Sequence, residues 1–252
     1  MLESSLPYSA PTPFQVVFLH GAGTGPWIWD AVRQALPHPS VALVVPSNRE
    51  RTSPEQCAQE LLSHRDFPSH GSVVLVLHSL AGVLETALVR SLGARAVHVV
   101  HVASVAPRPG RSFASTMGFP ASLVLPVLFR FQPRGLLPSP SMLVNQLGND
   151  FPDALRTKLV ELHRPEFPGL FLEPIGREAA TIPRSYIHCL KDRGVSPRLQ
   201  EKIAARLGAA IFPVDAGHMP MLSRPTEFVT ILQRIFAGMH ATVPANAAQV
   251  DE

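Results

Sequence analysis

The sequence has few charged residues, few cysteines and no long apolar run. Asp, Glu, Lys and Arg make up 16% of its 252 residues, against roughly 25% in a typical globular domain, which excludes a disordered, charge-rich scaffold. The two cysteines, Cys57 and Cys189, lie in separate segments with the pattern of regular structure, so we expect buried free thiols rather than a disulfide. Every apolar run is far shorter than the roughly 20 residues of a membrane helix, so no segment is expected to span a bilayer.

Positive charge is in slight excess and is scattered along the chain. There are 22 Lys and Arg residues and 19 Asp and Glu residues, with a sequence pI of about 9.2, but they form no dense basic cluster, so no nucleic-acid partner is expected. The first residues include Glu3 and lack a basic region, unlike a secretory signal, and we expect a cytoplasmic protein. His98 and His101 are three apart on a predicted strand and therefore point to opposite faces, and neither a metal nor another cofactor is expected.

Apolar, β-branched segments alternate with segments of helical spacing. Apolar runs predict strands, and the i, i+3, i+4 spacing between them predicts helices. Continuous apolar strands separated by helices indicate a mostly parallel sheet that is covered on both faces. The predicted fold is a doubly wound α/β sandwich, with strands at 15–20, 41–46, 72–79, 96–105, 185–193 and 210–218 and helices at 26–37, 53–64, 80–93, 141–163, 196–209 and 225–239.

The alternation breaks over residues 106–183, where prolines and short mixed apolar stretches replace it. We interpret this segment as an inserted helical cap. The α/β core is then made of residues 14–105 and 184–240. Residues 1–13 and 241–252 are expected to form flexible tails.

Ser79 lies where the third predicted strand turns directly into a helix. A nucleophile elbow places its serine at such a turn, which exposes the hydroxyl above the sheet edge and aims free helix N–H groups at a nearby oxyanion. The usual G-x-S-x-G motif is here L-H-S-L-A over residues 77–81, followed by Gly82. Ala81 is a mild departure because the position needs a small residue, whereas the bulkier Leu77 requires the helix to pack further from the strand. A helix N-cap is the alternative role for Ser79.

The first strand ends in a turn of small residues, His20-Gly21-Ala22-Gly23. Such a turn lets the backbone approach a ligand closely, and its N–H groups can complete an oxyanion hole. The expected donors are the N–H groups of Ala22 and Leu80. A nucleotide phosphate loop is the competing interpretation of this glycine-rich turn, but the stretch lacks both the G-x-G-x-x-G spacing and a G-K-[ST] sequence.

Two further candidates follow later predicted strands. His218 lies in a Gly-His-Met-Pro loop within reach of the carboxyl edge of the sheet, where it is placed to act as general base to Ser79. Asp192 ends the preceding strand, where a carboxylate can orient the imidazole. The order Ser79, Asp192, His218 matches the chain order of triads on this kind of fold. Asp215, three residues before His218, is an alternative acid, and Glu85 is expected to make only a solvent or cap contact.

These motifs resemble the α/β-hydrolase superfamily, and within it the small-cap branch of plant methylesterases and hydroxynitrile-lyase-like proteins with their bacterial esterase relatives. The resemblance covers nearly the whole of residues 14–240. It implies Ser79 as nucleophile, Asp192 as acid and His218 as base, with the two oxyanion donors already named. The motifs that carry it are HGAGTGPWIWD (20–30), HSLAG (78–82), NDFPDA (149–154), YIHCLKD (186–192) and DAGHMPMLSRPTEF (215–228).

Two departures within this superfamily favour ester hydrolysis. The lyase branch places a threonine after the histidine of the first strand and a lysine after the catalytic histidine, where this chain has Gly21 and Met219. Epoxide hydrolases and dehalogenases carry an aspartate at the elbow, where this chain has Ser79. The resemblance therefore implies neither cyanohydrin cleavage nor epoxide opening.

The expected activity is two-step acyl transfer from small to medium, largely apolar carboxylic esters or lactones, without a cofactor. Gly21, His78, Trp27 and Met219 are the expected substrate contacts, and the stretch 119–131 is expected to supply an apolar pocket. A small-molecule ester is the expected partner, and a homodimer is left open. Two other classes remain: a lyase or C–C bond hydrolase with the same triad, and a non-catalytic small-ligand receptor, for which the imperfect elbow is the warning sign.

Overall fold

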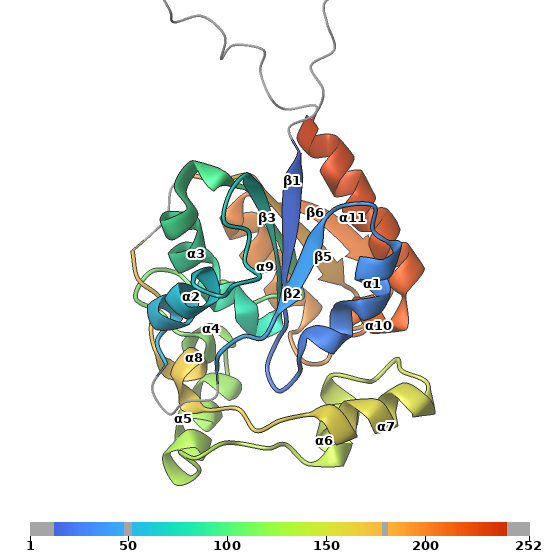
Figure 1. The fold of residues 1–252 in the computed structure, drawn as a ribbon. Helices are drawn as coiled ribbons and strands as arrows, with labels where there is room; N and C mark the ends of the chain where they lie inside the picture. The colour runs from blue at the N-terminus through green and yellow to red at the C-terminus, as the bar shows by residue number, and fades with distance from the viewer. Residues whose placement is uncertain (1–12, 48–51, 178–180, 241–252) are drawn as a thin grey trace, which may run out of the picture.

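Six parallel strands form the central sheet, which confirms the predicted doubly wound α/β fold (Figure 1). The computed structural model describes residues 13–47, 52–177 and 181–240. The tails predicted over 1–13 and 241–252 therefore lie outside the described residues, apart from Pro13. The strands are β1 (Phe14–Leu19), β2 (Ser40–Leu43), β3 (Ser72–His78), β4 (Ala96–Val102), β5 (Arg184–Cys189) and β6 (Ala210–Val214), in the sheet order β2-β1-β3-β4-β5-β6.

The central strand β3 shows why an apolar run becomes a strand here. Its side chains are buried along nearly the whole length of the strand. Leu75 and Leu77 belong to the apolar cluster on one face of the sheet. Val74 and Val76 belong to the cluster on the other face, as the two-residue period of a strand requires. Both faces of the sheet are therefore part of the core.

Helices cover both faces of this sheet. The helix α2 (Pro54–Leu62) begins with a capping box, in which Ser53 Oγ accepts the Gln56 N–H while the Gln56 side chain accepts the Ser53 N–H. In Figure 1 α2 and α3 lie on one side of the sheet, and α1, α10 and α11 lie on the other. The other helices outside the segment between β4 and β5, in which η marks a 3₁₀ helix, are η1 (Pro26–Trp29), α1 (Asp30–Ala35), η2 (Ser79–Leu84), α3 (Glu85–Leu92), η3 (Gly93–Arg95), α9 (Pro197–Leu207), α10 (Pro220–Ser223) and α11 (Pro225–His240).

The helices between β4 and β5 lie at the carboxyl ends of the strands, opposite the start of β1 (Figure 1). The prediction of one continuous helix over 141–163 is wrong, because the chain forms two helices there, α6 (Pro140–Gln146) and α7 (Asp153–Leu162). Gly148 and Pro152 lie in the break between them, and a proline cannot continue the backbone hydrogen bonding of a preceding helix. The helices described in this segment are α4 (Phe113–Thr116), α5 (Ala121–Phe131), α6 (Pro140–Gln146), α7 (Asp153–Leu162) and α8 (Pro168–Leu172).

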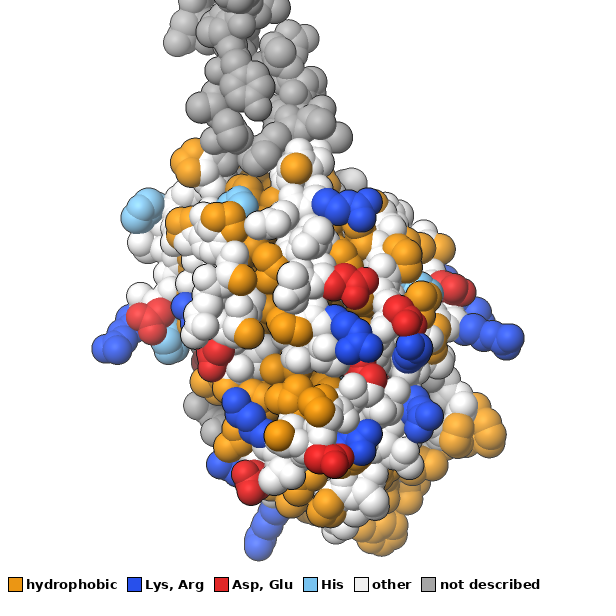
Figure 2. Space-filling model, turned by 90° about the vertical axis from the view of Figure 1, so that its right-hand side faces the viewer, with side chains coloured by type: hydrophobic (Ala, Val, Ile, Leu, Met, Phe, Trp, Pro, Cys, Tyr) orange, Lys and Arg blue, Asp and Glu red, His pale blue; other side chains and the backbone are white. Residues whose placement is uncertain are grey.

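The apolar stretch 119–131 turns most of its large side chains outward. Phe129 is buried and its ring packs on Phe171, but Phe119 is 86% exposed and Phe131 is 77% exposed. Figure 2 shows hydrophobic side chains gathered at this lower end of the molecule. The expectation of an apolar pocket from this stretch is therefore wrong for its outer face, which is solvent-facing surface. Among the described helices, none combines the length and apolar character needed to cross a membrane.

Glu85 is buried, and the expectation of a solvent or cap contact for it is wrong. Its Oε1 lies 2.5 Å from Arg184 Nε on β5, and its Oε2 lies 3.1 Å from His101 Nε2 on β4. Burial alone would raise the pKa of this carboxyl group, but His101 and Arg184 outweigh burial and lower it to about 2. The carboxylate therefore joins the first turn of α3 to two neighbouring strands.

Replacing Glu85 with Ala leaves the partly buried Arg184 and the buried His101 without their carboxylate partner, and we expect the free energy of unfolding to fall by about 3 kcal/mol. Urea unfolding followed by circular dichroism measures this loss. Since the folded-state pKa lies below the usual 4.5, the contribution of Glu85 is present above about pH 4.5 and is lost as the pH falls toward 2. Glu201→Ala, at an exposed position on α9, is the matched control, and equal losses in the two variants would contradict a stabilising role for Glu85.

Candidate active site

Ser79 begins η2 immediately after β3, in a left-handed backbone conformation with φ of 53°. A positive φ is unfavourable for a residue with a side chain, so the surrounding structure must hold the turn. The carbonyl oxygen of Ser79 accepts hydrogen bonds from the Val105 N–H at 3.0 Å and from Ser104 Oγ at 3.3 Å. The segment after β4 therefore holds the strand-to-helix turn in place.

Small residues are needed on both sides of this turn. A Cβ atom at Gly21 would lie 2.7 Å from Ser79 Cβ, and one at Gly82 would lie 2.1 Å from Ser104 Oγ. The first contact shows how closely the turn after β1 approaches the serine. Leu77, the bulky residue in the elbow, is fully buried in the core cluster that also contains residues of α3. Positions 21 and 82 therefore need a residue without a side chain, whereas position 77 accommodates a leucine in the core.

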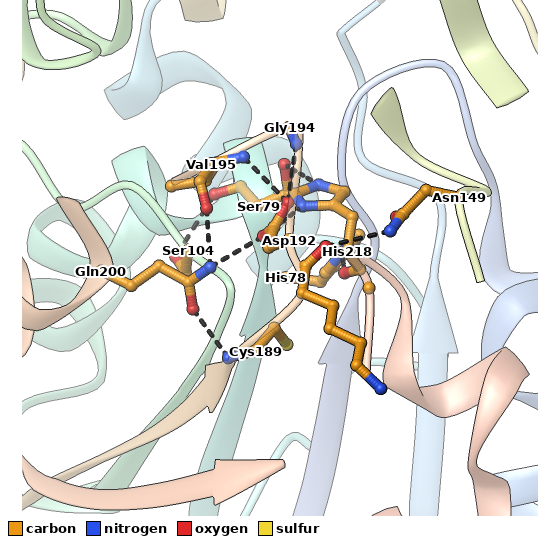
Figure 3. A network of polar contacts seen from close by, with 12 residues as sticks. His78, Ser79, Ser104, Asn149, Cys189, Asp192, Gly194, Val195, Gln200 and His218 are labelled. Carbon is orange, nitrogen blue, oxygen red and sulfur yellow. Dashed lines mark hydrogen bonds and ion pairs between the residues drawn. The ribbon is translucent and has the colours of Figure 1, made fainter. Parts of the chain in front are cut away.

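The structure brings Ser79, His218 and Asp192 together in a continuous chain of hydrogen bonds (Figure 3). Ser79 Oγ lies 2.9 Å from His218 Nε2, and His218 Nδ1 lies 2.8 Å from Asp192 Oδ2. These partners assign the proton of the neutral ring to Nδ1, which donates to the carboxylate, and leave Nε2 to accept from the serine hydroxyl. The exposed fractions of the three residues are 6% for Ser79, 2% for His218 and 5% for Asp192.

Asp192 is held by donors from the loop after β5 and from α9 (Figure 3). Its Oδ1 accepts the Gly194 N–H at 2.7 Å and the Val195 N–H at 3.0 Å, and its Oδ2 also accepts Gln200 Nε2 at 2.8 Å. The same Gln200 amide donates to the Val195 carbonyl and accepts the Cys189 N–H. Gln200 thus ties the carboxylate to the end of β5.

Our sequence reasoning missed Gln200, although a signal for it exists. Gln200 precedes Ile203 by three residues and Ala204 by four, and all three are buried on the same face of α9. A polar side chain on the apolar stripe of a helix needs a buried hydrogen-bond partner. The pattern marks Gln200 as a residue with a buried polar contact, but it does not identify Asp192 as that contact.

The loop that carries His218 is fixed from two directions. His78 Nε2 donates to the His218 carbonyl at 3.0 Å, and burial, followed by the nearby His218, lowers the pKa of His78 well below its usual value. The Gly217 N–H donates to Asp150 Oδ2 at 2.8 Å. Asp150 lies in the break between α6 and α7, next to Asn149, whose Nδ2 donates to the Lys191 carbonyl. The backbone around His218 is therefore positioned by neutral His78 and by the segment between β4 and β5.

The remaining sequence candidates lie in different surroundings. Asp215 is exposed and its Oδ2 lies 2.6 Å from Lys191 Nζ, so its carboxylate pairs with a lysine at the surface. Trp27 is partly buried in η1, with Lys158 Nζ of α7 4.9 Å from the centre of its ring. Met219 is fully buried in the core cluster on the α11 face. Within the described residues, no three His, Cys, Asp or Glu side chains gather as a metal site.

Both cysteines are buried free thiols, as predicted. Burial raises the pKa of Cys57, with smaller contributions from Glu60 and Glu166, and it raises the pKa of Cys189 well above its usual value. Both thiols are therefore protonated at neutral pH, and neither has the character of an activated nucleophile.

Comparison with known proteins gives consistent matches over most of the chain. A sequence model of the Alpha/beta hydrolase family matches residues 16–231. Methylesterase 18 of Arabidopsis thaliana is 26% identical over 249 residues, which cover 86% of this chain and 94% of that protein. A solved methylesterase from Arabidopsis has a TM-score of 0.70 at 23% identity, over 89% of this chain and 99% of that one. An extracellular alpha/beta-hydrolase from a Paenibacillus species has a TM-score of 0.75 at 16% identity, over 88% and 98%.

Replacing Gln200 with Ala leaves the Cys189 N–H and the Val195 carbonyl without a buried partner. Each unsatisfied buried group costs about 1–3 kcal/mol, so we expect the free energy of unfolding to fall by about 2 kcal/mol or more. Urea unfolding measures this loss. Gln59→Ala, at an exposed position on α2, is the control and should stay within about 0.5 kcal/mol of the wild type. Equal urea midpoints for the two variants would show that the Gln200 contacts do not stabilise the fold.

Proposed function

This chain belongs to the alpha/beta hydrolase family, and we propose that it is a serine carboxylesterase that works through an acyl-enzyme. Ser79 is the nucleophile, His218 is the general base and Asp192 orients the imidazole. The observation that carries this proposal is the unbroken series of contacts from Ser79 Oγ through the His218 ring to the Asp192 carboxylate. A serine that served only as a helix N-cap would not need a buried imidazole and carboxylate beside it.

The two steps follow from this geometry. His218 Nε2 takes the hydroxyl proton as Ser79 Oγ attacks the ester carbonyl carbon, and Asp192 stabilises the imidazolium that forms. The tetrahedral intermediate then collapses, and His218 returns the proton to the leaving alcohol. Water, activated by His218 in the same way, releases the acid from Ser79 in the second step. No cofactor takes part in either step.

The N–H groups of Leu80 and Ala22 are the proposed oxyanion donors. Leu80 lies in the first turn of η2, where helix N–H groups have no partner within the helix. Ala22 follows Gly21, whose backbone is in close contact with Ser79. In this proposal the two N–H groups donate to the oxygen on which the negative charge of the intermediate develops.

The proposed substrates are small carboxylic esters, including methyl esters. The side chains of Ser79 and His218 are almost fully enclosed, which favours a small alcohol group at the reacting carbonyl. The similarity to proteins described as methylesterases points in the same direction. Met219 occupies the position after His218 where the lyase branch has a lysine, which favours hydrolysis over cyanohydrin cleavage.

A fluorophosphonate probe should label the wild-type protein at Ser79, because such probes react with activated serines. Ser79→Ala should abolish labelling and lower the turnover of p-nitrophenyl acetate by at least roughly 10⁴-fold. Peptide mass spectrometry identifies the labelled residue. Ser69→Ala, which changes a serine away from the site, is the control and should be labelled like the wild type. A folded wild-type protein that the probe does not label would contradict the serine-hydrolase mechanism.

Asp192→Asn should lower kcat by up to roughly 10⁴-fold, because an amide no longer stabilises the imidazolium or selects the reactive tautomer. Asp215→Asn, which changes an exposed carboxylate, should leave kcat within about twofold of the wild type. Steady-state kinetics on p-nitrophenyl acetate measures both variants. Near-normal turnover in Asp192→Asn together with a large loss in Asp215→Asn would reverse the assignment of the acid.

A further inference from the structure

The first peptide group of the turn after β1 is fixed by two hydrogen bonds to the Gly21 carbonyl. His20 Nδ1 donates to this oxygen at 2.8 Å, and Thr24 Oγ1 donates to it at 3.0 Å. The Val45 N–H donates to His20 Nε2 at 2.9 Å, and burial lowers the pKa of His20 to about 4, so the ring is neutral with its proton on Nδ1. In a trans peptide the C=O and N–H groups point in opposite directions, so these bonds also set the direction of the Ala22 N–H.

The next two peptide groups of the turn are held by the segment that follows α7. The Gly23 N–H donates to Glu166 Oε1 at 2.5 Å, and the Gly23 carbonyl accepts the Arg164 N–H at 2.8 Å. Gly23 has φ of +64°, and a Cβ atom there would lie 2.0 Å from His163 Nε2. The turn is thus packed directly against residues that lie far away in the sequence.

Glu166 is itself held rigidly where it meets the turn. Its backbone forms an isolated antiparallel bridge with Leu136, with hydrogen bonds of 2.8 and 3.1 Å. Ser47 Oγ lies 3.3 Å from the same Oε1 that accepts the Gly23 N–H, and Oε2 is buried without a hydrogen-bond partner among the described residues. Burial raises the pKa of this carboxyl group to about 7, although its bonds to Gly23 and Ser47 lower it. Placing a carboxyl group here is costly, which argues for a role beyond filling space.

We propose that Glu166 is a positioning residue for catalysis, which holds the Ala22–Gly23 peptide so that the Ala22 N–H stays aimed at the oxyanion. The inference rests on the proposed function, since it concerns one of the two proposed oxyanion donors. Glu166 reaches the turn through its side chain, so a substitution can remove its hydrogen bond while the backbone bridge to Leu136 stays in place. Loss of an oxyanion donor typically costs 10²- to 10³-fold in kcat, and a donor that is only loosened should cost less.

The test compares three substitutions of Glu166 by steady-state kinetics on p-nitrophenyl acetate. Glu166→Ala removes the acceptor and should lower kcat about tenfold to hundredfold while KM stays within about twofold, since the donor acts mainly in the transition state. Glu166→Gln keeps an acceptor oxygen at the same reach and should stay within about threefold of the wild type. Glu166→Asp keeps a carboxyl group but shortens the side chain, and it should behave like the alanine variant.

Glu55→Ala is the matched control. Glu55 lies on α2, and its carboxylate accepts the backbone N–H of Gly176, in the segment between β4 and β5, at 3.1 Å. Glu55→Ala should leave kcat unchanged even if its thermal melting temperature falls as far as that of Glu166→Ala. If Glu166→Ala does not fold, the contrast between Glu166→Gln and Glu166→Asp decides the question.

Three results would overturn this role for Glu166. They are normal kcat in Glu166→Ala, equal losses in Glu166→Gln and Glu166→Asp, or an effect confined to KM. Fluorophosphonate labelling of the wild type separates this outcome from a failure of the proposed function. A wild type that is labelled at Ser79 and hydrolyses the ester, together with fully active Glu166 variants, would reject only the positioning role. An unlabelled wild type would reject the serine mechanism itself.

Discussion

In a parallel sheet every strand ends at the same edge, and the arrangement of Ser79, Asp192 and His218 depends on that constraint. The three residues follow β3, β5 and β6, which lie within four neighbouring strands of the sheet. Short loops are then sufficient to bring the Ser79 hydroxyl within 2.9 Å and the Asp192 carboxylate within 2.8 Å of the His218 imidazole. The core therefore determines the approximate position of each group, and local hydrogen bonds determine its orientation.

The sequence is sufficient to predict the approximate position of each group, but it is only partly sufficient to predict the hydrogen bonds that orient the groups. Continuous apolar runs predict the strands, and the ends of those strands predict that Ser79, Asp192 and His218 lie at one edge of the sheet. The hydrogen bonds that orient these groups come from Gln200, Asp150 and other side chains that no local pattern connects to them. Long-range polar contacts depend on how loops fold back over the sheet, and a single sequence carries little information about that.

The helix α5 shows a different limit of sequence reasoning. Its sequence ASLVLPVLFRF is apolar on almost every face, so its hydrophobic pattern does not indicate which side is buried. The structure buries the side that carries Phe129 and leaves Leu123 and Val127 exposed. Apolar composition alone therefore could not distinguish a substrate pocket from an exposed apolar surface.

The segment between β4 and β5 makes polar contacts with the loops around Ser79 at two separate places. Asp150 accepts the N–H next to His218, and Glu166 accepts the N–H next to Ala22. Each of these carboxyl groups also has a buried oxygen without a partner among the described residues, so each is retained at a cost in stability. Polar groups kept at such a cost commonly mark a functional site. The same segment, which covers the carboxyl edge of the sheet, therefore takes part in positioning both the proposed base and one proposed oxyanion donor.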